Sequence, residues 1–151
     1  MTKEIKINNL SELKQYASKI SQCLLPGDCI CLEGQMGAGK TTLVSALAAA
    51  LNAKQTVTSP TFTLIQHYDA DIPLIHMDLY RIDTQDQIIE LDLARYMQDP
   101  EKVCLIEWSE KLEDSAPDEY IKIELKYIEN KPDARMMYIK SQPERKWISA
   151  L

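Results

Sequence analysis

The sequence predicts a three-layer α/β/α fold, in which helices cover both faces of a mainly parallel sheet that carries an antiparallel hairpin at one edge. Three observations support this fold class. Short apolar runs alternate with segments of helical periodicity, which is the pattern of a sheet built from strand–helix–strand units. A glycine-rich turn joins one apolar run to a helix, and two alternating segments near the C-terminus flank a polar turn. The 151 residues are enough for one domain, residues 1–151, with a substantial core.

The first predicted elements are a strand, a helix and a second strand. Residues 3–7 alternate between polar and apolar side chains, as a short strand does. Asn9 is the expected helix cap, with Glu12 reaching back to it. The apolar positions that follow recur at helical spacing: Leu10, Leu13, Tyr16, Ala17 and Ile20. Pro26-Gly27 indicates a turn, and the short apolar run 28–32 is typical of a buried parallel strand.

The middle of the chain is predicted to hold a helix, two strands and another helix. Behind the glycine-rich turn, an apolar stripe marks a helix that ends near Asn52. The stripe consists of Leu43, Leu47 and Leu51, with Val44 and Ala48 beside it. Residues 63–68 and 74–77 are predicted strands around an Asp-rich turn that contains Pro73. A polar start at Asp83-Thr84 leads into a helix with these apolar positions: Ile88, Ile89, Leu91, Leu93 and Ala94.

The C-terminal third is predicted to add three strands. Residues 103–106 form a short apolar run, as expected of a buried strand. Residues 121–128 and 136–140 alternate in hydropathy and are separated by the polar turn 130–133. We therefore expect these two segments to pair antiparallel at one edge of the sheet.

Charge and composition exclude several classes of protein. Residues 1–60 carry six basic and four acidic side chains, a balance of +2, whereas residues 61–151 carry eleven against nineteen, a balance of −8. No basic face for a bare nucleic-acid duplex is visible, and the acidic part suits a basic protein partner better. No apolar run approaches the about 20 residues of a membrane span, and the N-terminus lacks the apolar core of a signal peptide. A cytoplasmic protein is therefore expected.

Residues 34–41, GQMGAGKT, match the phosphate-loop pattern GxxxxGK[ST] and lie between a predicted strand and a predicted helix. Glycines let the backbone curl so that several N–H groups point at one phosphate, and the following helix adds the positive end of its dipole. The backbone groups expected to do so belong to Gly37, Ala38 and Gly39. Lys40 can reach the β- and γ-phosphates, the Thr41 hydroxyl can ligate Mg²⁺, and Thr42 can touch the α-phosphate. The loop thus predicts a nucleoside triphosphate with Mg²⁺, bound on a fold of the P-loop NTPase type.

An enzyme with a phosphate loop needs a carboxylate at the end of a second strand to orient Mg²⁺. Two residues compete for this role, because Asp78 closes the apolar run LIHMD and Glu107 closes VCLIE. Neither acid is followed by a second one, since Leu79 and Trp108 come next, whereas efficient ATPase motors pair two acids. The residues alone leave both candidates open.

Four motifs follow one another along the chain: GQMGAGKTT at residues 34–42, SPTF at 59–62, HMDLYR at 76–81 and IEWSE at 106–110. Their order and spacing closely resemble those of the TsaE family, also called YjeE, over about residues 5–140. The resemblance implies a small ATPase with weak activity on its own, which uses ATP and Mg²⁺. It also implies the partners TsaB and TsaD, which transfer a threonylcarbamoyl group to the adenosine beside the anticodon of certain tRNAs. In this family the ATP cycle is thought to support repeated turnover of the complex rather than the transfer itself, so tRNA is met through the complex.

The resemblance also implies roles for the residues around the phosphates. Lys40 and Thr41 match the phosphate and Mg²⁺ positions of the family. Glu107 matches the metal-binding acid, which decides between the two candidates in its favour. Asp78 matches an acid needed for hydrolysis, acting on the attacking water.

Further positions match more peripheral parts of the family site. Thr61 matches a mobile segment that behaves like a GTPase switch and is expected to take part in catalysis. Trp108 matches a tryptophan near the nucleotide, and Arg135 matches a late arginine near the base. Gln35 stands where the family often has an acid, and its side chain is expected to point away from the phosphates.

Three alternatives compete with a partner-dependent ATPase. A small GTPase is suggested by NKPD at 130–133, which matches the guanine-reading pattern NKxD, but no DxxG follows a strand because Arg81 stands three residues after Asp78. A small-molecule kinase would bring arginines over the phosphates, but Arg95 is the only arginine in residues 83–118. A nucleotide-gated binding module, in which ATP controls association and hydrolysis resets it, overlaps with the TsaE-like function.

Overall fold

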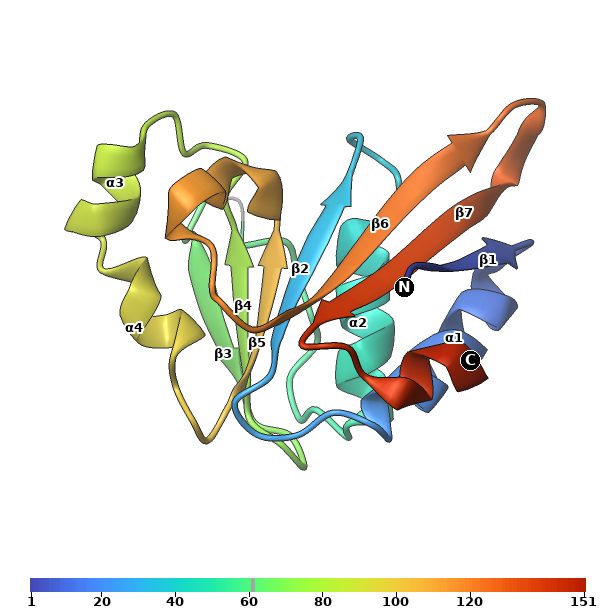
Figure 1. Cartoon of the computed structure of the whole chain (residues 1–151), viewed down its shortest axis with the longest axis horizontal. Coiled ribbons are helices and arrows are strands. Elements are labelled where there is room, and N and C mark those ends of the chain that lie inside the picture. Colours follow the sequence, from blue (N-terminus) through green and yellow to red (C-terminus); the bar gives the residue numbers. More distant parts are fainter. Residues whose placement is uncertain (61) are drawn as a thin grey trace.

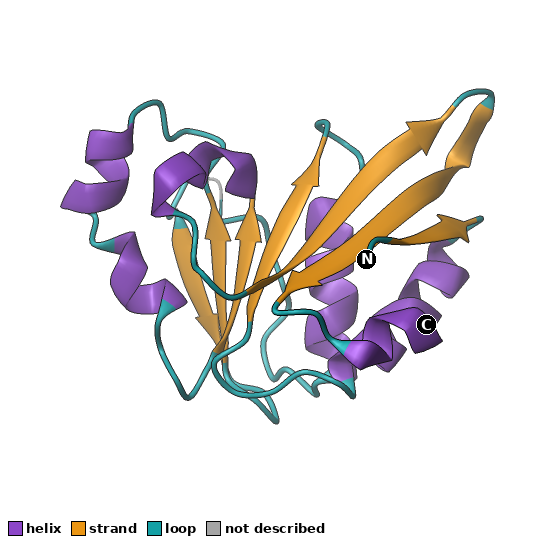
Figure 2. Cartoon of the chain, in the orientation of Figure 1, coloured by secondary structure: helices purple, strands orange, loops and turns teal. Residues whose placement is uncertain are grey.

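The computed structural model describes residues 1–60 and 62–151. Within these residues, seven strands form a single sheet in the order β1-β7-β6-β2-β5-β4-β3 (Figures 1 and 2). The strands are β1 (Lys3–Ile7), β2 (Cys29–Gly34), β3 (Ile65–Tyr68), β4 (Leu74–Asp78), β5 (Val103–Glu107), β6 (Tyr120–Ile128) and β7 (Lys131–Gln142). Every predicted strand is therefore present, with shifted ends for several of them.

The sheet is parallel in its centre and antiparallel on both sides. Strands β6, β2, β5 and β4 run parallel to one another, whereas β3 joins β4, β7 joins β6 and β1 joins β7 antiparallel. The predicted α/β class is confirmed, but the parallel part is limited to these four strands. The expected position of the β6–β7 hairpin at the edge is wrong, because β1 pairs with the outer side of β7 and takes the edge position.

Helices cover both faces of the sheet, which confirms the three-layer architecture (Figure 1). One layer holds α1 (Leu10–Ser21), α2 (Lys40–Ala50) and the 3-10 helix η2 (Lys146–Ala150), and the other holds α3 (Gln85–Glu90), α4 (Leu93–Met97) and the 3-10 helix η1 (Ser109–Ser115). Along β2 the side chains alternate between the two layers. Ile30 and Leu32 pack in the cluster with α1 and α2, and Cys29 and Cys31 pack in the cluster with α3 and α4. Within the described residues, no helix has the length and apolarity to cross a membrane.

The start of α1 follows the predicted capping pattern with one difference. The Asn9 side chain accepts a hydrogen bond from the Glu12 backbone N–H at 2.9 Å, as expected of a cap. The Glu12 carboxylate reaches back one residue further, and accepts from the backbone N–H of Asn8 at 2.8 Å. Leu10, which was expected on the apolar face of the helix, is half-exposed beside a surface pocket.

The helix predicted after residue 83 is broken into α3 and α4. Thr84 caps α3 in a capping box with Gln87, so the predicted start is confirmed. Asp92 then adopts a left-handed conformation at φ 51°, which ends one helical path and begins another. On α3 only Ile88 is buried, whereas Ile89 and Leu91, which were also expected among the apolar positions, are exposed.

The hairpin turn between β6 and β7 is tighter than the sequence suggested. Only Glu129 and Asn130 form the turn, with Asn130 at φ 59°. Residues 131–133 belong to β7, so three of the four letters of the NKPD match lie in a strand. Asparagine tolerates this left-handed position better than most residues, which accounts for its place in the turn.

Candidate active site

The phosphate loop connects β2 to α2 at the carboxyl end of the central parallel strands, where ligands of α/β folds usually bind. Gly34 stands at the end of β2 with φ +147°, and a Cβ atom there would lie 2.6 Å from the Leu125 carbonyl oxygen of β6. Only glycine fits so close to a neighbouring backbone. Gly39 precedes α2 without a side-chain cap, so the N–H groups of the first helical turn have no side-chain acceptor and face the loop.

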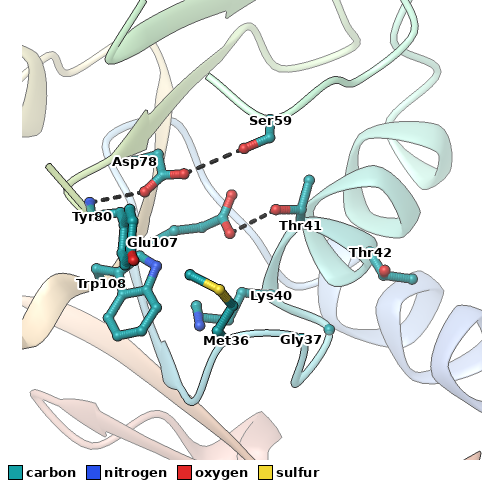
Figure 3. A pocket seen from close by; sticks show the side chains of 11 residues that line it. Met36, Gly37, Lys40, Thr41, Thr42, Ser59, Asp78, Tyr80, Glu107 and Trp108 are labelled. Carbon is teal, nitrogen blue, oxygen red and sulfur yellow. Dashed lines mark hydrogen bonds between the residues drawn. The ribbon is translucent and has the colours of Figure 1, made fainter. Parts of the chain in front are cut away.

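A pocket of about 310 Å³ opens above this loop (Figure 3). Its walls come from the loop, the first turn of α2, the segment before β3, and the segments at the ends of β4 and β5. The lining residues are Met36, Gly37, Gly39, Lys40, Thr41, Thr42, Ser59, Asp78, Tyr80, Glu107 and Trp108. Among the described residues, the pocket thus gathers the predicted phosphate, metal and hydrolysis residues apart from Ala38 and Arg135.

Lys40 is almost fully buried at the start of α2. Its ammonium group donates hydrogen bonds to the carbonyl oxygens of Gly34 and Gln35, and it lies 4.0 Å from the centre of the Trp108 ring. Burial lowers the pKa of Lys40, while the negative charges of Glu107, Glu110 and Asp78 act in the opposite direction. The cation is therefore held inside the arc of the loop, against an aromatic ring and close to carboxylates.

Thr41 and Glu107 are joined across the pocket. The Thr41 hydroxyl donates to Oε1 of Glu107 at 2.7 Å (Figure 3). The other carboxylate oxygen, Oε2, lies 2.6 Å from Nε2 of the fully buried His76 on β4. These contacts fix the carboxylate so that Oε1 faces the hydroxyl that the loop motif assigns to Mg²⁺. A hydroxyl and a carboxylate are the oxygen ligands that Mg²⁺ prefers, so the pair fits that ion.

Asp78 lies beside Glu107 but is held by different partners. The two acids are direct neighbours on the parallel strands β4 and β5. Oδ1 of Asp78 accepts from the Tyr80 backbone N–H at 2.9 Å, and Oδ2 accepts from the Ser59 hydroxyl at 3.3 Å. Asp78 is thus attached to the segments before β3 and after β4, whereas Glu107 is attached to the phosphate loop helix. Thr61, the predicted switch residue, lies outside the described residues.

Aromatic side chains form one wall of the pocket. Trp108 follows β5 in a left-handed conformation at φ 59°, and its ring lies 5.2 Å from that of Tyr80. Lys111 donates to the carbonyl oxygens of Tyr80 and Ile82, which attaches the segment after β4 to η1. Trp108 and Tyr80 therefore both line the pocket that contains Lys40 and Thr41.

Arg135 lies on the other side of the phosphate loop. It lines a second pocket of about 380 Å³ that shares Gly37, Gly39 and Thr42 with the first. Ala38 also lines this second pocket. The Arg135 guanidinium donates from Nε to the Ala38 carbonyl oxygen at 3.0 Å.

Two contributors to the site were missed from the sequence. His76 was given no role in the site, but its Nε2 lies 2.6 Å from Oε2 of the metal-binding candidate Glu107. Tyr127 of β6 donates from its hydroxyl to the Met36 carbonyl oxygen at 2.8 Å. The position of His76 in the HMDLYR motif, two residues before Asp78, could have indicated a role in the site. The contact of Tyr127 depends on the sheet register, and no sequence motif contains this residue.

Comparisons with known proteins point to one family. The family model for threonylcarbamoyl adenosine biosynthesis protein TsaE matches residues 7–137. The chain is 40% identical over 119 residues to the tRNA threonylcarbamoyladenosine biosynthesis protein TsaE of Bacillus subtilis, covering 78% of this chain and 73% of that protein. It is 37% identical to the protein of the same name from Aquifex aeolicus, covering 90% and 96%.

A solved structure agrees with these sequence matches. The crystal structure of Bacillus subtilis YdiB superimposes with a TM-score of 0.72 at 32% identity, covering 92% of this chain and 84% of YdiB. The resemblance seen in the four motifs thus extends over the fold and over nearly the full length of the chain. The chain belongs to the TsaE family.

Proposed function

We propose that this protein hydrolyses ATP with Mg²⁺ and thereby supports threonylcarbamoyladenosine formation in tRNA, together with TsaB and TsaD, without performing the group transfer itself. The observation that carries the proposal is the convergence of Lys40, the Thr41–Glu107 pair and Asp78 on one pocket of a TsaE-family chain. These are the parts that phosphoryl transfer to water requires: a cation for the phosphates, oxygen ligands for the metal, and an acid for the water.

The metal and phosphate roles follow from position. Thr41 and Glu107 would hold Mg²⁺, which neutralises charge on the β- and γ-phosphates when bound. Lys40 would leave the two loop carbonyl oxygens that it contacts and bind the phosphates, because charged phosphate oxygens accept hydrogen bonds more strongly than carbonyl oxygens do. His76 would keep the Glu107 carboxylate in its orientation, as the outer partners of metal ligands commonly do.

Asp78 is the residue proposed to orient the attacking water. It is buried, lines the pocket and lies next to Glu107 in the sheet, so it can approach the γ-phosphate side. Its contact with Ser59 links it to the segment that contains Thr61, for which we propose the switch role implied by the family. Hydrolysis would then depend on how this segment is placed, which suits an enzyme whose rate is set by a partner.

The second pocket would hold the nucleoside part of ATP. It lies across the loop from the Mg²⁺ side, shares Thr42 with the first pocket, and has apolar walls that include Leu13 and Pro132. Asp133 also lines it, and it is the last residue of the NKPD match. Competition between ATP and GTP for the purified protein therefore separates the ATPase from the GTPase alternative, and tighter binding of GDP than of ADP would favour the GTPase.

The acidic part of the chain suits a protein partner with a basic surface. Residues 61–151 carry a balance of −8. Several of the acids are exposed on and beside α3, α4 and η1: Asp86, Glu90, Asp92, Glu113 and Asp114. Complementary charge of this kind would speed association with a basic partner and make it sensitive to salt.

Reconstitution tests the proposed function. ATP turnover and the number of tRNA modification cycles would be measured with and without TsaB and TsaD, for the wild type, Lys40→Ala and Lys54→Ala. Lys54 is exposed and lines neither pocket, so its variant controls for the loss of a positive charge. We expect stimulation by the partners for the wild type and Lys54→Ala and none for Lys40→Ala. If the partners change neither ATP turnover nor modification in the wild type, the functional proposal is wrong.

A further inference from the structure

The β6–β7 hairpin contacts the outer side of the phosphate loop through two side chains. Tyr127 and Arg135 are direct partners in the antiparallel register of the hairpin. The Tyr127 hydroxyl donates to the Met36 carbonyl oxygen at 2.8 Å, and Arg135 donates to the carbonyl oxygens of Ala38 at 3.0 Å and Gly37 at 3.5 Å. Three consecutive loop carbonyls thus receive donors from one place in the sheet. We call this pair of side chains the hairpin clamp.

The clamp is itself fixed before it reaches the loop. The Arg135 guanidinium lies 4.3 Å from the centre of the Tyr127 ring, so the two side chains pack on each other. Nη1 of Arg135 also donates to the carbonyl oxygens of Pro132 at 2.6 Å and Ala134 at 2.8 Å. A guanidinium with this many contacts in its own hairpin has little rotamer freedom left to lose.

The loop accommodates the clamp at a glycine. Gly37 has φ +78°, and a Cβ atom at that position would lie 2.7 Å from the Tyr127 hydroxyl. The Tyr127 hydroxyl therefore occupies the space that the Cβ atom of any other residue at position 37 would fill. The close approach at Gly37 is therefore part of the contact between the hairpin and the loop.

We propose that Tyr127 and Arg135 are positioning residues that hold the phosphate loop in its binding shape by its carbonyls. A phosphate loop must turn its N–H groups inward, and donors on its outer side keep the carbonyls turned outward. A loop ordered in advance loses less entropy when the nucleotide binds, so the clamp raises affinity without touching the phosphates. This inference rests on the proposed nucleotide binding, and it gives Arg135 a role in ordering the loop in addition to its place in the wall of the second pocket.

The test compares two conservative variants with two matched controls. Tyr127→Phe removes one hydroxyl, and Arg135→Lys keeps the charge but loses the planar fork of donors. Tyr138→Phe on β7 and Arg95→Lys on α4 make the same chemical changes at residues that line neither pocket at the loop. Two quantities are measured for each: the Kd for Mg-ATP and Mg-ADP by calorimetry, and the ¹⁵N order parameters of amides 35–39 without nucleotide. Circular dichroism melting confirms that each variant is folded.

We expect each clamp variant to weaken the binding of both nucleotides by about 3- to 10-fold, as the loss of one or two partly exposed hydrogen bonds does. The order parameters of amides 35–39 should fall in the same variants, and neither control should change either quantity. Unchanged order parameters in both clamp variants would overturn the proposal, even if Arg135→Lys alone weakened binding, because Arg135 would then contact the nucleotide directly. Should the wild type bind no nucleotide, the proposed function would fail, while the order parameters would still decide whether the clamp orders the loop.

Discussion

Replacing Gly34 by alanine tests whether the phosphate loop is built against the neighbouring strand. Gly34 pairs with Leu125 of β6 in the parallel register, and its φ of +147° lies in a region that side chains rarely adopt. A Cβ atom would lie 2.6 Å from the Leu125 carbonyl oxygen and 3.2 Å from the Ala38 Cβ. Because the first of these contacts is to backbone, the loop itself would have to move.

The expected loss of stability has two parts. The unfavourable φ alone costs about 1–3 kcal/mol, and forcing an extra methyl group into a packed site costs about another 1–3 kcal/mol. Gly27→Ala is the matched control, because Gly27 also has a positive φ, of +93°, but its nearest atom to an added Cβ is the Pro100 carbonyl oxygen at 3.6 Å. That distance is ordinary contact, so Gly27→Ala should lose only the first part.

Urea unfolding measures both variants. Gly34→Ala should reduce the free energy of unfolding by about 1–3 kcal/mol more than Gly27→Ala does. It should also weaken ATP binding, because the displaced loop presents its N–H groups in a different direction, whereas Gly27→Ala should bind ATP like the wild type. Equal losses of stability in the two variants would show that Leu125 does not confine the loop, and the reasoning from the close contact would be refuted.

Three further variants probe the side chains of the pocket. Glu107→Gln should weaken Mg-ATP binding by at least about tenfold while the affinity for metal-free ATP stays nearly constant, and Glu113→Gln is the control. Calorimetry with and without Mg²⁺ measures both affinities. If the dependence of ATP binding on Mg²⁺ is unchanged in Glu107→Gln, the metal role of Glu107 is contradicted. Asp78→Asn should slow hydrolysis by about 10²-fold or more and change the Kd for ATP little. If turnover and binding assays show that the hydrolysis rate and the ATP affinity fall by the same factor, Asp78 does not act by orienting the attacking water. Burial lowers the pKa of Lys40 below its ordinary value of 10.5, so between these two pKa values the unfolded chain binds more protons than the folded one. The stability of the wild type should therefore gain from Lys40 as pH rises through that alkaline window, and urea unfolding at a series of pH values should show a smaller rise for Lys40→Met.

The parts of the fold that the sequence predicted are those set by local pattern. Buried strands such as β5 are continuous apolar runs, and β1 matched its predicted limits because alternation alone defines it. The break between α3 and α4 could not be predicted, because neither glycine nor proline marks it in the sequence. The left-handed conformation of Asp92 depends on the packing of both helices. The outer position of β1 likewise depends on a pairing between the two ends of the chain.

In the candidate site, too, some positions follow from local sequence and others depend on contacts between distant parts of the chain. The spacing of the loop motif places Lys40 and Thr41 by covalent geometry, so their positions followed from the sequence. The partners of these residues come from distant parts of the chain. His76 reaches Glu107 only because β4 and β5 are neighbours in a given register, and Tyr127 reaches the loop only because β6 lies beside β2. No local pattern encodes such contacts.

The two strand-end acids show how neighbours give similar sequence positions different chemistry. Asp78 and Glu107 each close a buried strand, lie side by side in the sheet and are almost fully buried. Glu107 accepts from the loop threonine and is fixed by a buried imidazole, which suits an oxygen that must hold a metal at constant distance. Asp78 accepts instead from the Tyr80 backbone after β4 and from Ser59 before β3, so neither of these two contacts comes from the phosphate loop. We therefore infer that the two acids of the proposed ATPase can be perturbed independently, Glu107 through its contacts with Thr41 and His76, and Asp78 through the segments before β3 and after β4.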